Sequence, residues 1–470
     1  MNKTKNKFTV ITTSFLIQLA KTIKLILNIY FSKNTNQSIN SEIIETEEDS
    51  DKSNDITSKI YSLSPDYSIE QLDAIYNTII LKQSFYNSEY SQNWEITPYR
   101  AMAEMIVTVI NPKSHLDIGC GIGLLVQAMR DKQVESCGLE YSESLVEQAN
   151  SSIRQYIKNI SIEEMILDWE NHFKQKDVIS LTEVCEHLPI SILEKVFSLF
   201  SQNHKGAIFA TIPSYGLDST FKHGIKVNPD TPSWLRDMQE NIPFKNIVLE
   251  NALPHHGHIT LASYRWWTEF FLYYGWSRNR DLEFSCNRNF KHTLITYNWN
   301  PYILEPIVEI DRVNESIKSG NGLNLGWYDY DDDVKGRWTD GFARIVFKNN
   351  SSIYGIKLKL STPDINIIQD WELCLRVDSL AKDYNYKFIW NPCLISKPIE
   401  VPRKSETEVE VEILLFPFKS VDVELPSLPN CWRLNIMSSK FSPKDYDLSP
   451  NVKELGIVVH SIEILVDDRL

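Results

Sequence analysis

Between residues 114 and 213 short apolar runs alternate with amphipathic stretches. Apolar runs of about 4–8 residues are typical of buried strands, whereas recurrence at a period of 3.6 residues indicates helices. The pattern predicts two upstream helices at 66–93 and 100–111, then strands separated by helices at 124–132 and 144–157. Repeated strand–helix units predict an α/β fold with a doubly wound, mostly parallel sheet and helices on both faces. The predicted strands are 115–118, 136–140, 162–167, 177–181 and 207–212.

The pattern changes near residue 305, where apolar and polar residues alternate one by one. Such alternation over about 4–8 residues predicts strands with one buried face, and turn residues separate the runs. No long helix is predicted between them. The region therefore reads as an all-β sandwich or jelly roll. Its clearest runs are 356–360, 372–377, 408–413 and 421–425.

Charge divides the N-terminal part of the chain. Residues 1–33 contain six lysines and no acid, whereas residues 34–55 contain seven acids and one lysine. The resulting division is a basic amphipathic segment at 1–33, an acidic linker at 34–60, a first domain at 61–304 and a β-sandwich at 305–470.

Apolar residues recur at helical spacing between Phe8 and Phe31, so the segment 8–31 is predicted to be an amphipathic helix. Lys21 and Lys24 interrupt the roughly 20 apolar residues that a membrane span needs. Two readings stay open: a helix lying on the inner face of a membrane, and a helix packed on the protein or a frayed tail.

The composition of the 470 residues restricts the class of partner. Hydrophobic residues make up 42% and charged residues 23%, as in globular proteins, and the net charge of −14 argues against a broad nucleic-acid interface. The seven cysteines form no C-x-x-C pair, which favours a reducing compartment, the cytoplasm.

A glycine-rich turn follows the first predicted strand of the sheet, at Gly119-Cys-Gly-Ile-Gly123. Glycine lets the backbone turn sharply and approach a ligand closely. A dinucleotide fingerprint would need a small residue at position 124, which here is leucine. Taken alone, the turn fits a nucleotide site and a structural turn equally well.

Acidic residues close the next predicted strands. Glu140 stands 21 positions after Gly119, where a carboxylate can accept both hydroxyls of a ribose. Asp168 is predicted to accept from an adenine amino group, with Trp169 against the purine ring. The segment 183–188, Glu-Val-Cys-Glu-His-Leu, follows the fourth strand. Because parallel strands end at one edge, these acids are predicted to face one crevice.

Three segments, 115–123, 138–140 and 183–188, resemble the successive motifs of class I S-adenosylmethionine-dependent methyltransferases. The E-V-x-E-H signature resembles the branch that methylates small molecules, quinones and sugars. The likeness covers roughly residues 85–300. It implies a Rossmann-like methyltransferase with a seven-stranded sheet and S-adenosyl-L-methionine as cofactor. The residues predicted to surround this cofactor are Asp117, Gly119, Cys120, Gly121, Gly123, Glu140, Tyr141, Asp168, Trp169, Glu183 and Glu186.

Methyl transfer from a sulfonium needs an aligned nucleophile and, for a hydroxyl acceptor, a base. His187 and His258 are the two candidates, and each could instead serve only as a hydrogen-bonding group. His258 and the stretch 263–276 resemble the family's H-x-x-x-x-S segment and the helix after it. Arg100 pairs with the cofactor carboxylate or is an ordinary surface arginine.

Three histidines within 255–258 suggest a metal, but no cysteine or Glu-x-x-His partner stands near them, so no metal site is predicted. The insertion 214–250 is predicted to form the acceptor's roof, because loops carry specificity. It contains aromatic, basic and histidine side chains suited to an acceptor, namely Tyr215, Phe221, His223, Trp234 and Arg236.

Near the C-terminus the segments 326–330, 337–344 and 454–457 resemble a β-sandwich module of bacterial surface-polysaccharide enzymes. The resemblance implies carbohydrate binding or docking to a glycan assembly. The alternative is that Trp327, Trp338 and Phe342 simply fill the sandwich core.

The predicted function is methylation of a sugar hydroxyl on a polysaccharide or lipid-linked glycan. Two alternatives stay open: methylation of a quinone or other small lipid, and glycan binding by a methyltransferase fold without turnover.

Overall fold

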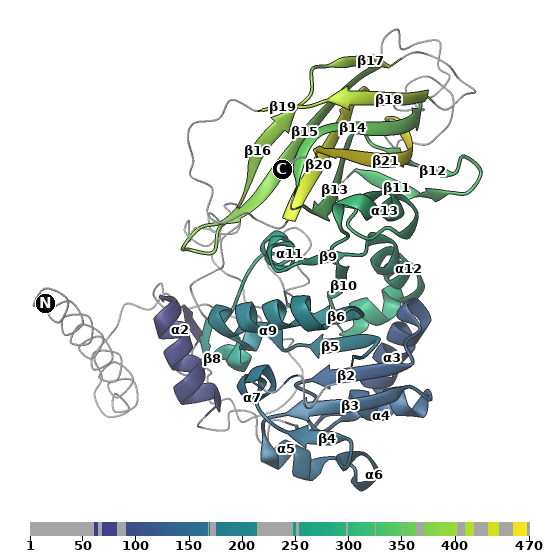
Figure 1. Cartoon of the computed structure of the whole chain (residues 1–470). Helices are drawn as coiled ribbons and strands as arrows, with labels where there is room; N and C mark the ends of the chain where they lie inside the picture. The colour runs from purple at the N-terminus through teal and green to yellow at the C-terminus, as the bar shows by residue number, and fades with distance from the viewer. Residues whose placement is uncertain are drawn as a thin grey trace, which may run out of the picture.

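The structure is a computed structural model of the 470-residue chain (Figure 1). It describes residues 61–63, 68–81, 91–167, 169, 175–213, 248–250, 253–297, 299–324, 326–349, 351–362, 371–401, 409–417, 431–440 and 455–467. The basic segment 1–33, the acidic linker and most of the insertion lie outside these residues, so the predictions made for them stay predictions. Among the described helices, none is long and apolar enough to cross a membrane.

A seven-stranded sheet forms the first domain, in the order β4-β3-β2-β5-β6-β10-β9. The first five of these strands run parallel, and β10 pairs antiparallel with both β6 and β9. The predicted doubly wound, mostly parallel sheet is therefore confirmed. Its strands are β2 Ser114–Ile118, β3 Glu135–Glu140, β4 Ile157–Asn159, β5 Val178–Thr182, β6 Ala207–Thr211, β9 Trp276–Arg278 and β10 Pro301–Pro306.

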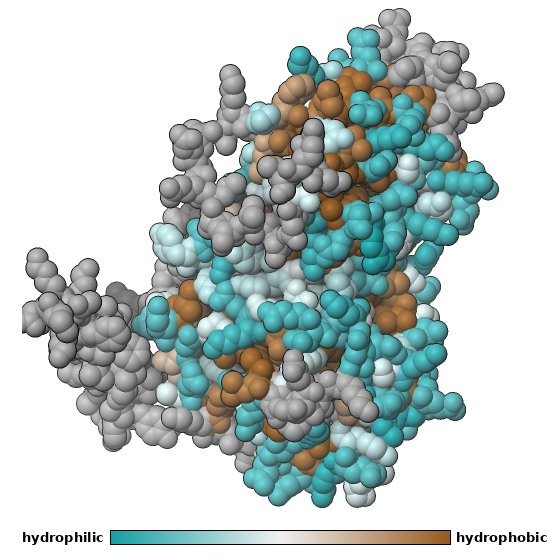
Figure 2. All heavy atoms as spheres, viewed as in Figure 1, coloured by the Kyte–Doolittle hydropathy of each residue, from teal (hydrophilic) through white to brown (hydrophobic). Residues whose placement is uncertain are grey.

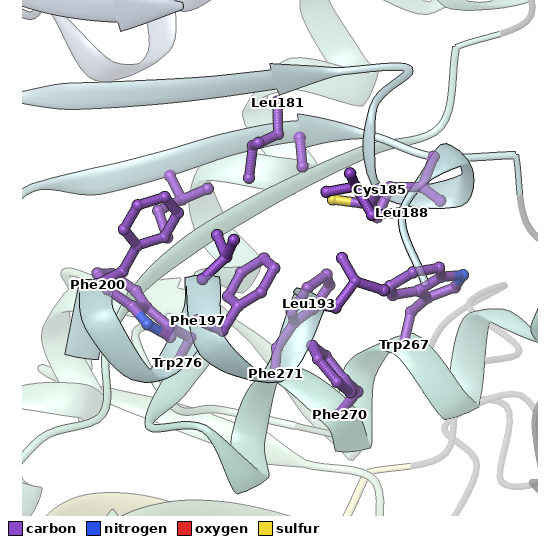
Figure 3. Packing of buried hydrophobic residues seen from close by; sticks show 14 of the residues in the cluster. Leu181, Cys185, Leu188, Leu193, Phe197, Phe200, Trp267, Phe270, Phe271 and Trp276 are labelled. Carbon is purple, nitrogen blue, oxygen red and sulfur yellow. The ribbon is translucent and has the colours of Figure 1, made fainter. Parts of the chain in front are cut away.

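Side chains of these strands alternate between two cores, one on each face of the sheet. In β6, Ile208 and Ala210 join the larger core, whereas Ala207 and Phe209 join the smaller one. The larger core lies under α2, α7, α9 and α11 and is rich in aromatic rings (Figure 3). The smaller core lies under α3, α4 and α12. The helices are α2 Ile69–Ile75, α3 Ile96–Ile110, α4 Leu124–Asp131, α5 Glu143–Gln148, α6 Ser151–Arg154, α7 Ile162–Leu167, α9 Ile190–Asn203, α11 Tyr264–Tyr273 and α12 Arg280–Tyr297.

Two predictions in this domain are wrong. The helix expected over 144–157 is divided into α5 and α6, because Asn150 caps a new helix with its side chain, and it is followed by the strand β4. The strand expected over 162–167 is the helix α7. Ser161 and Glu164 form reciprocal side-chain bonds to each other's backbone N–H at its start, which is a capping box. Asp168 therefore follows a helix instead of a strand, and it lies outside the described residues.

Short elements connect the main ones. In place of one helix over 66–93, α2 continues into a π-helical turn, η2 Tyr76–Leu81. A small antiparallel sheet joins β1 Tyr61–Leu63 to β7 Val248–Glu250 and β8 Leu253–Pro254. The 3₁₀ turns are η3 Cys185–His187, η4 His255–Gly257 and η5 Ile310–Arg312, and α13 Val313–Ser319 follows the last of them.

The C-terminal region consists of antiparallel sheets, as predicted. One has the order β11-β12-β21-β14-β18, and the other β13-β20-β15-β16-β19 with β17 paired to β15. Both sheets contribute alternate side chains to one shared core. Their strands are β11 Trp327–Asp331, β12 Gly336–Thr339, β13 Phe342–Lys348, β14 Ser352–Ser361, β15 Trp371–Lys382, β16 Phe388–Ile395, β17 Ile399–Val401, β18 Val409–Leu414, β19 Phe416–Pro417, β20 Cys431–Ser438 and β21 Val458–Asp467.

The outer face of the second sheet packs directly on the first domain through α11 (Figure 1). Leu380, Phe388 and Cys431 belong to the aromatic core of the first domain. The indole of Trp266 donates to the backbone oxygen of Tyr386 at 2.8 Å. The two parts thus share buried apolar surface, while their outward faces carry the hydrophilic residues visible in Figure 2.

Candidate functional site

A cavity of about 590 Å³ opens at the carboxyl ends of β2, β3 and β5. This is the edge where ligands bind in doubly wound sheets. Its lining includes both histidine candidates and seven of the residues predicted to surround the cofactor. These nine are Asp117, Gly119, Cys120, Gly121, Glu140, Tyr141, Glu183, His187 and His258.

The glycine turn forms the floor of the cavity. Gly119, Gly121 and Gly123 all have positive φ angles, between 54° and 76°, which L-residues with side chains rarely adopt. A Cβ atom on Gly121 would lie 2.5 Å from the ring of Trp94, another lining residue. The absence of that atom lets the turn and the indole lie against each other at the cavity wall.

Glu140 is nearly buried, at 5% exposure, and its carboxylate is held by the backbone. One oxygen accepts from the N–H of Gly121 and the other from the N–H of Ser142, both at 2.9 Å. A carboxylate has about four lone-pair sites, so each oxygen keeps one for a ligand hydroxyl. Burial raises the pKa of Glu140. Tyr141 beside it donates through its hydroxyl to the backbone oxygen of Ile80, which ties η2 to the sheet.

Asp117 lies one residue before the end of β2 and belongs to a buried chain of polar groups. Its carboxylate accepts from the hydroxyl of Ser180 at 2.5 Å, and His115 lies between the hydroxyls of Ser180 and Ser136 at 2.7 and 2.8 Å. Burial raises the pKa of Asp117 to about 7 and lowers that of His115 to about 3. No local sequence pattern predicts this His–Ser network, because its members lie on three separate strands.

Three predicted cofactor residues do not line the cavity. Gly123 caps α4 behind the turn, and Trp169 is buried in the aromatic core with its ring 5.5 Å from Phe200. The carboxyl of Glu186 is buried behind the wall. Arg100 also lies elsewhere, because it is exposed and 3.8 Å from Asp131.

The third strand end is occupied by residues that the sequence-based prediction missed. Ile160, Ser161 and Ile162, just after β4, line the cavity in the place assigned to Asp168. The capping signature Ser161-x-x-Glu164 could have revealed this boundary. An aromatic part of the wall was also missed, and it consists of Tyr76, Trp94, Tyr99, Tyr297 and Trp299.

The turn after β5 brings Glu183 and His187 to one side of the cavity, with Glu186 buried behind them and His258 supplied by a separate loop. Glu183 has a φ of 53°, a strained conformation for a residue with a side chain, and its N–H donates to Thr211. The backbone then folds so that Glu186 and His187 follow in a 3₁₀ turn. The N–H groups of Ile259 and Thr260 both donate to the backbone oxygen of Glu186, which fixes the loop that contains His258.

Glu186, His187 and His258 converge, with one ligand atom of each within 4.8 Å of the others. The imidazole rings lie 4.9 Å apart, and one carboxylate oxygen of Glu186 lies 3.6 Å from His187 and 4.0 Å from His258. Neither oxygen of Glu186 has a hydrogen-bond partner among the described residues, although both are buried. A buried polar group without a partner costs roughly 1–3 kcal/mol, which is the sign of a site that a ligand completes.

The environment disfavours charge on these groups. Burial, with the neighbouring Glu183, raises the pKa of Glu186 well above its usual value, and burial raises that of Glu183 to about 7. Burial lowers the pKa of His187 to about 4, so its imidazole is neutral near pH 7 and has a lone pair to offer. Two imidazoles and a carboxylate are a donor set that suits a divalent transition-metal ion. The sequence-based prediction of no metal site stays a prediction.

Comparison with known proteins identifies the first domain. Residues 98–275 match the family model described as a methyltransferase domain, a family that depends on S-adenosylmethionine. This segment contains the glycine turn, Glu140 and the turn that contains His187. The predicted enzyme class and cofactor are therefore confirmed for this domain, while the roles of single residues stay predictions.

Solved structures with partial likeness are also methyltransferases. The plantazolicin methyltransferase BpumL, with a monoazolic desmethylPZN analogue and SAH, is 20% identical; the match covers 31% of this chain and 61% of that one, with a TM-score of 0.24. The mitomycin 7-O-methyltransferase MmcR is 13% identical; the match covers 44% of this chain and 56% of that one, with a TM-score of 0.29. The chain thus spans less than two thirds of these proteins. No curated protein matches it.

Proposed function

We propose that the chain transfers the methyl group of S-adenosylmethionine to a hydroxyl of a sugar in a polysaccharide or lipid-linked glycan. The observation that carries this proposal is the convergence of Glu186, His187 and His258 beside the cavity that holds the glycine turn and Glu140. A hydroxyl must lose its proton as the oxygen attacks, so groups that can accept a proton beside the cavity suit methyl transfer to oxygen.

A hydroxylated ring suits the remaining wall. Trp94, Tyr99, Tyr297 and Trp299 offer aromatic faces, and His256 and Glu183 add polar atoms on the same cavity. Sugars present an apolar face of C–H groups and an edge of hydroxyls, so this combination supports a sugar acceptor. A quinol would share the aromatic contacts and use fewer of the polar ones.

The activity test uses the full chain, S-adenosylmethionine and three acceptor classes: polysaccharide, lipid-linked glycan and quinol. We expect S-adenosylhomocysteine release with a glycan, and a product heavier by one CH₂. Release only with the quinol would contradict the sugar proposal. A chain that binds the cofactor and releases nothing with any acceptor would favour the glycan-binding alternative.

We also propose that the cluster of Glu186, His187 and His258 binds a divalent cation, since neither oxygen of its buried carboxylate has a hydrogen-bond partner among the described residues. When bound, such an ion would lower the pKa of an acceptor hydroxyl. Titration with Mn²⁺ followed by electron paramagnetic resonance measures binding without activity. We expect saturable binding that His258→Gln abolishes and that the exposed control His292→Gln leaves unchanged. Equal binding by both variants would contradict the site and leave His187 or His258 as a direct base.

A further inference from the structure

A second cavity, of about 350 Å³, lies at the junction of the two domains. It is formed by α11, β9 and the start of α12 on one side, and by the 320–326 loop, β11 and β13 on the other (Figure 1). Among the described lining residues, none is shared with the methyltransferase cavity. Ligand sites are commonly found at domain interfaces, and this volume is near the lower end of their range.

Two of the three C-terminal segments singled out in the sequence, 326–330 and 337–344, contribute residues to this cavity. Gly326 has a φ of 86°, and a Cβ there would lie 1.8 Å from the backbone oxygen of Phe342, so glycine lets the loop lie flat on β13. Trp327 then enters the sandwich core and donates from its indole to Arg344. Tyr328 and Asp340 line the cavity. The core-filling alternative therefore holds for Trp327, while its neighbours face the cavity.

Arg337, in the segment 337–344, lies behind the cavity wall and holds several of its elements together. It is fully buried and bonds Asp281 and the backbone oxygens of Ile317 and Tyr328. These contacts connect β12, β11 and the first turn of α12, so they hold the backbone of Arg280 at the cavity. Arg278, another lining residue, is neutralised by bonds to the carboxylate of Glu283.

Two lining side chains have unused hydrogen-bonding groups. Neither the guanidinium of Arg280 nor the side-chain amide of Asn324 has a hydrogen bond or ion pair to any described residue. The charges of Asp281, Asp329 and Asp340 nevertheless act on Arg280. Both residues are about half-buried. Asp340 uses one oxygen to accept from the N–H of Phe342 and lies across the same cavity. The cavity thus contains a hydrogen-bond donor in Arg280, an acceptor in Asp340, and an amide that can do both in Asn324.

The charges of the lining residues balance. Two arginines, Arg278 and Arg280, stand against two acids, Glu283 and Asp340. An anionic ligand would meet Asp340 and a cationic one Arg280, so the balance favours a neutral ligand with both donors and acceptors. Leu272, Leu323 and Val346 add apolar contacts. A neutral sugar ring with neighbouring hydroxyls satisfies all of these groups at once.

We propose that this junction cavity binds one neutral monosaccharide unit of a glycan, with Arg280, Asn324 and Asp340 bonding its hydroxyls. The choice of a glycan rests on the proposed function, but the cavity is separate from the methyl-transfer site. It would hold one unit of the acceptor chain while another reaches the methyltransferase cavity.

Saturation-transfer NMR on the full chain tests this with methyl glucoside, methyl mannoside, methyl galactoside and methyl glucuronide as probes. We expect saturable binding of at least one neutral glycoside and weaker binding of the glucuronide. Arg280→Met and Asn324→Ala should each weaken the neutral glycoside by about tenfold or more, as expected for lost bonds to a charged or amide group. Lys291→Met, an exposed charge change on the same helix, should have no effect.

Three results would overturn the proposal: no binding of any probe, unchanged binding in Arg280→Met, or preference for the glucuronide. S-adenosylhomocysteine binding is measured on the same samples. Its retention in Arg280→Met shows that the fold is intact. Loss of glycoside binding with intact cofactor binding supports the junction site even if no methyl transfer to sugar is found, so failure of the two proposals can be told apart.

Discussion

Buried carboxyl groups have opposite surroundings in the β-sandwich and in the methyltransferase cavity. In the sandwich, Asp378 is fully buried but accepts bonds from Arg376, Arg433 and Asn435, and these partners lower its pKa. In the methyltransferase cavity, Asp117 and Glu140 have no basic partner, and burial raises the pKa of each.

The presence or absence of basic partners distinguishes acids that stabilise the fold from acids that bind a ligand. A buried acid that is bonded by arginine and asparagine stabilises the folded state. Removing it would leave the buried arginine without a counter-charge. Acids left without a cation in a cavity favour a ligand that supplies positive charge or hydroxyl groups. S-adenosylmethionine supplies both, as a sulfonium and as a ribose.

The largest expected effect is on Asp378. Its replacement by alanine leaves Arg433 buried without a counter-charge, and we expect a loss of about 3–5 kcal/mol in the free energy of unfolding. Urea denaturation measures it. The exposed Asp311→Ala serves as the control and should be neutral. A loss below about 1 kcal/mol would show that the buried pair is not structural.

For Glu140 the expected effect is on cofactor binding. Glu140→Ala removes an acceptor of the ribose hydroxyls, so we expect S-adenosylhomocysteine affinity to fall by about 1–3 kcal/mol, measured by calorimetry. Glu143→Ala, an exposed acid three residues further on, should bind as the wild type does. Unchanged affinity in Glu140→Ala would remove the ribose role.

His115 links the cavity to acid stability. Its folded-state pKa, about 3, is below the usual value of 6.5 because burial disfavours the charged ring. The unfolded chain therefore binds a proton between pH 6.5 and 3 that the folded chain does not. This stabilising contribution is complete above pH 6.5 and is lost as pH falls, by about 2 kcal/mol at pH 5. The raised pKa values of Asp117 and Glu183 act in the opposite direction over the same pH range, so the His115 contribution is read as a difference between two proteins. The free energy of unfolding of the wild type minus that of His115→Phe should fall by about 2 kcal/mol between pH 7 and pH 5.

The smallest effect is expected at Arg100. It is exposed and its ion pair with Asp131 spans 3.8 Å, so Arg100→Ala should change both stability and cofactor affinity by less than about 0.5 kcal/mol. A tenfold loss of S-adenosylhomocysteine affinity would instead place this arginine on the cofactor carboxylate.

Much of the fold follows from local pattern. β5 is a short, mostly apolar run, and β14 alternates over residues 356–360, so their type is readable along the chain. β4 is only three residues long and contains Lys158 and Asn159, so it has no such pattern. The apolar residues of α7 imitate a strand, and only the Ser161–Glu164 capping box distinguishes it.

The candidate site was readable where it depends on adjacent residues. The glycine turn and Glu140 are such cases. Glu186 and His258 lie close together in space although they are far apart in the sequence. The ring of Trp169 packs in the aromatic core against Phe200 of α9 and does not line the cavity. Both arrangements depend on tertiary packing, so no local sequence pattern predicts them.

Calorimetric titration of the full chain with S-adenosylhomocysteine tests the central claim most directly. The account predicts saturable binding with one nucleoside per chain, at the cavity that contains the glycine turn and Glu140. No binding heat over a range of temperatures, from a chain shown to be folded, would contradict it.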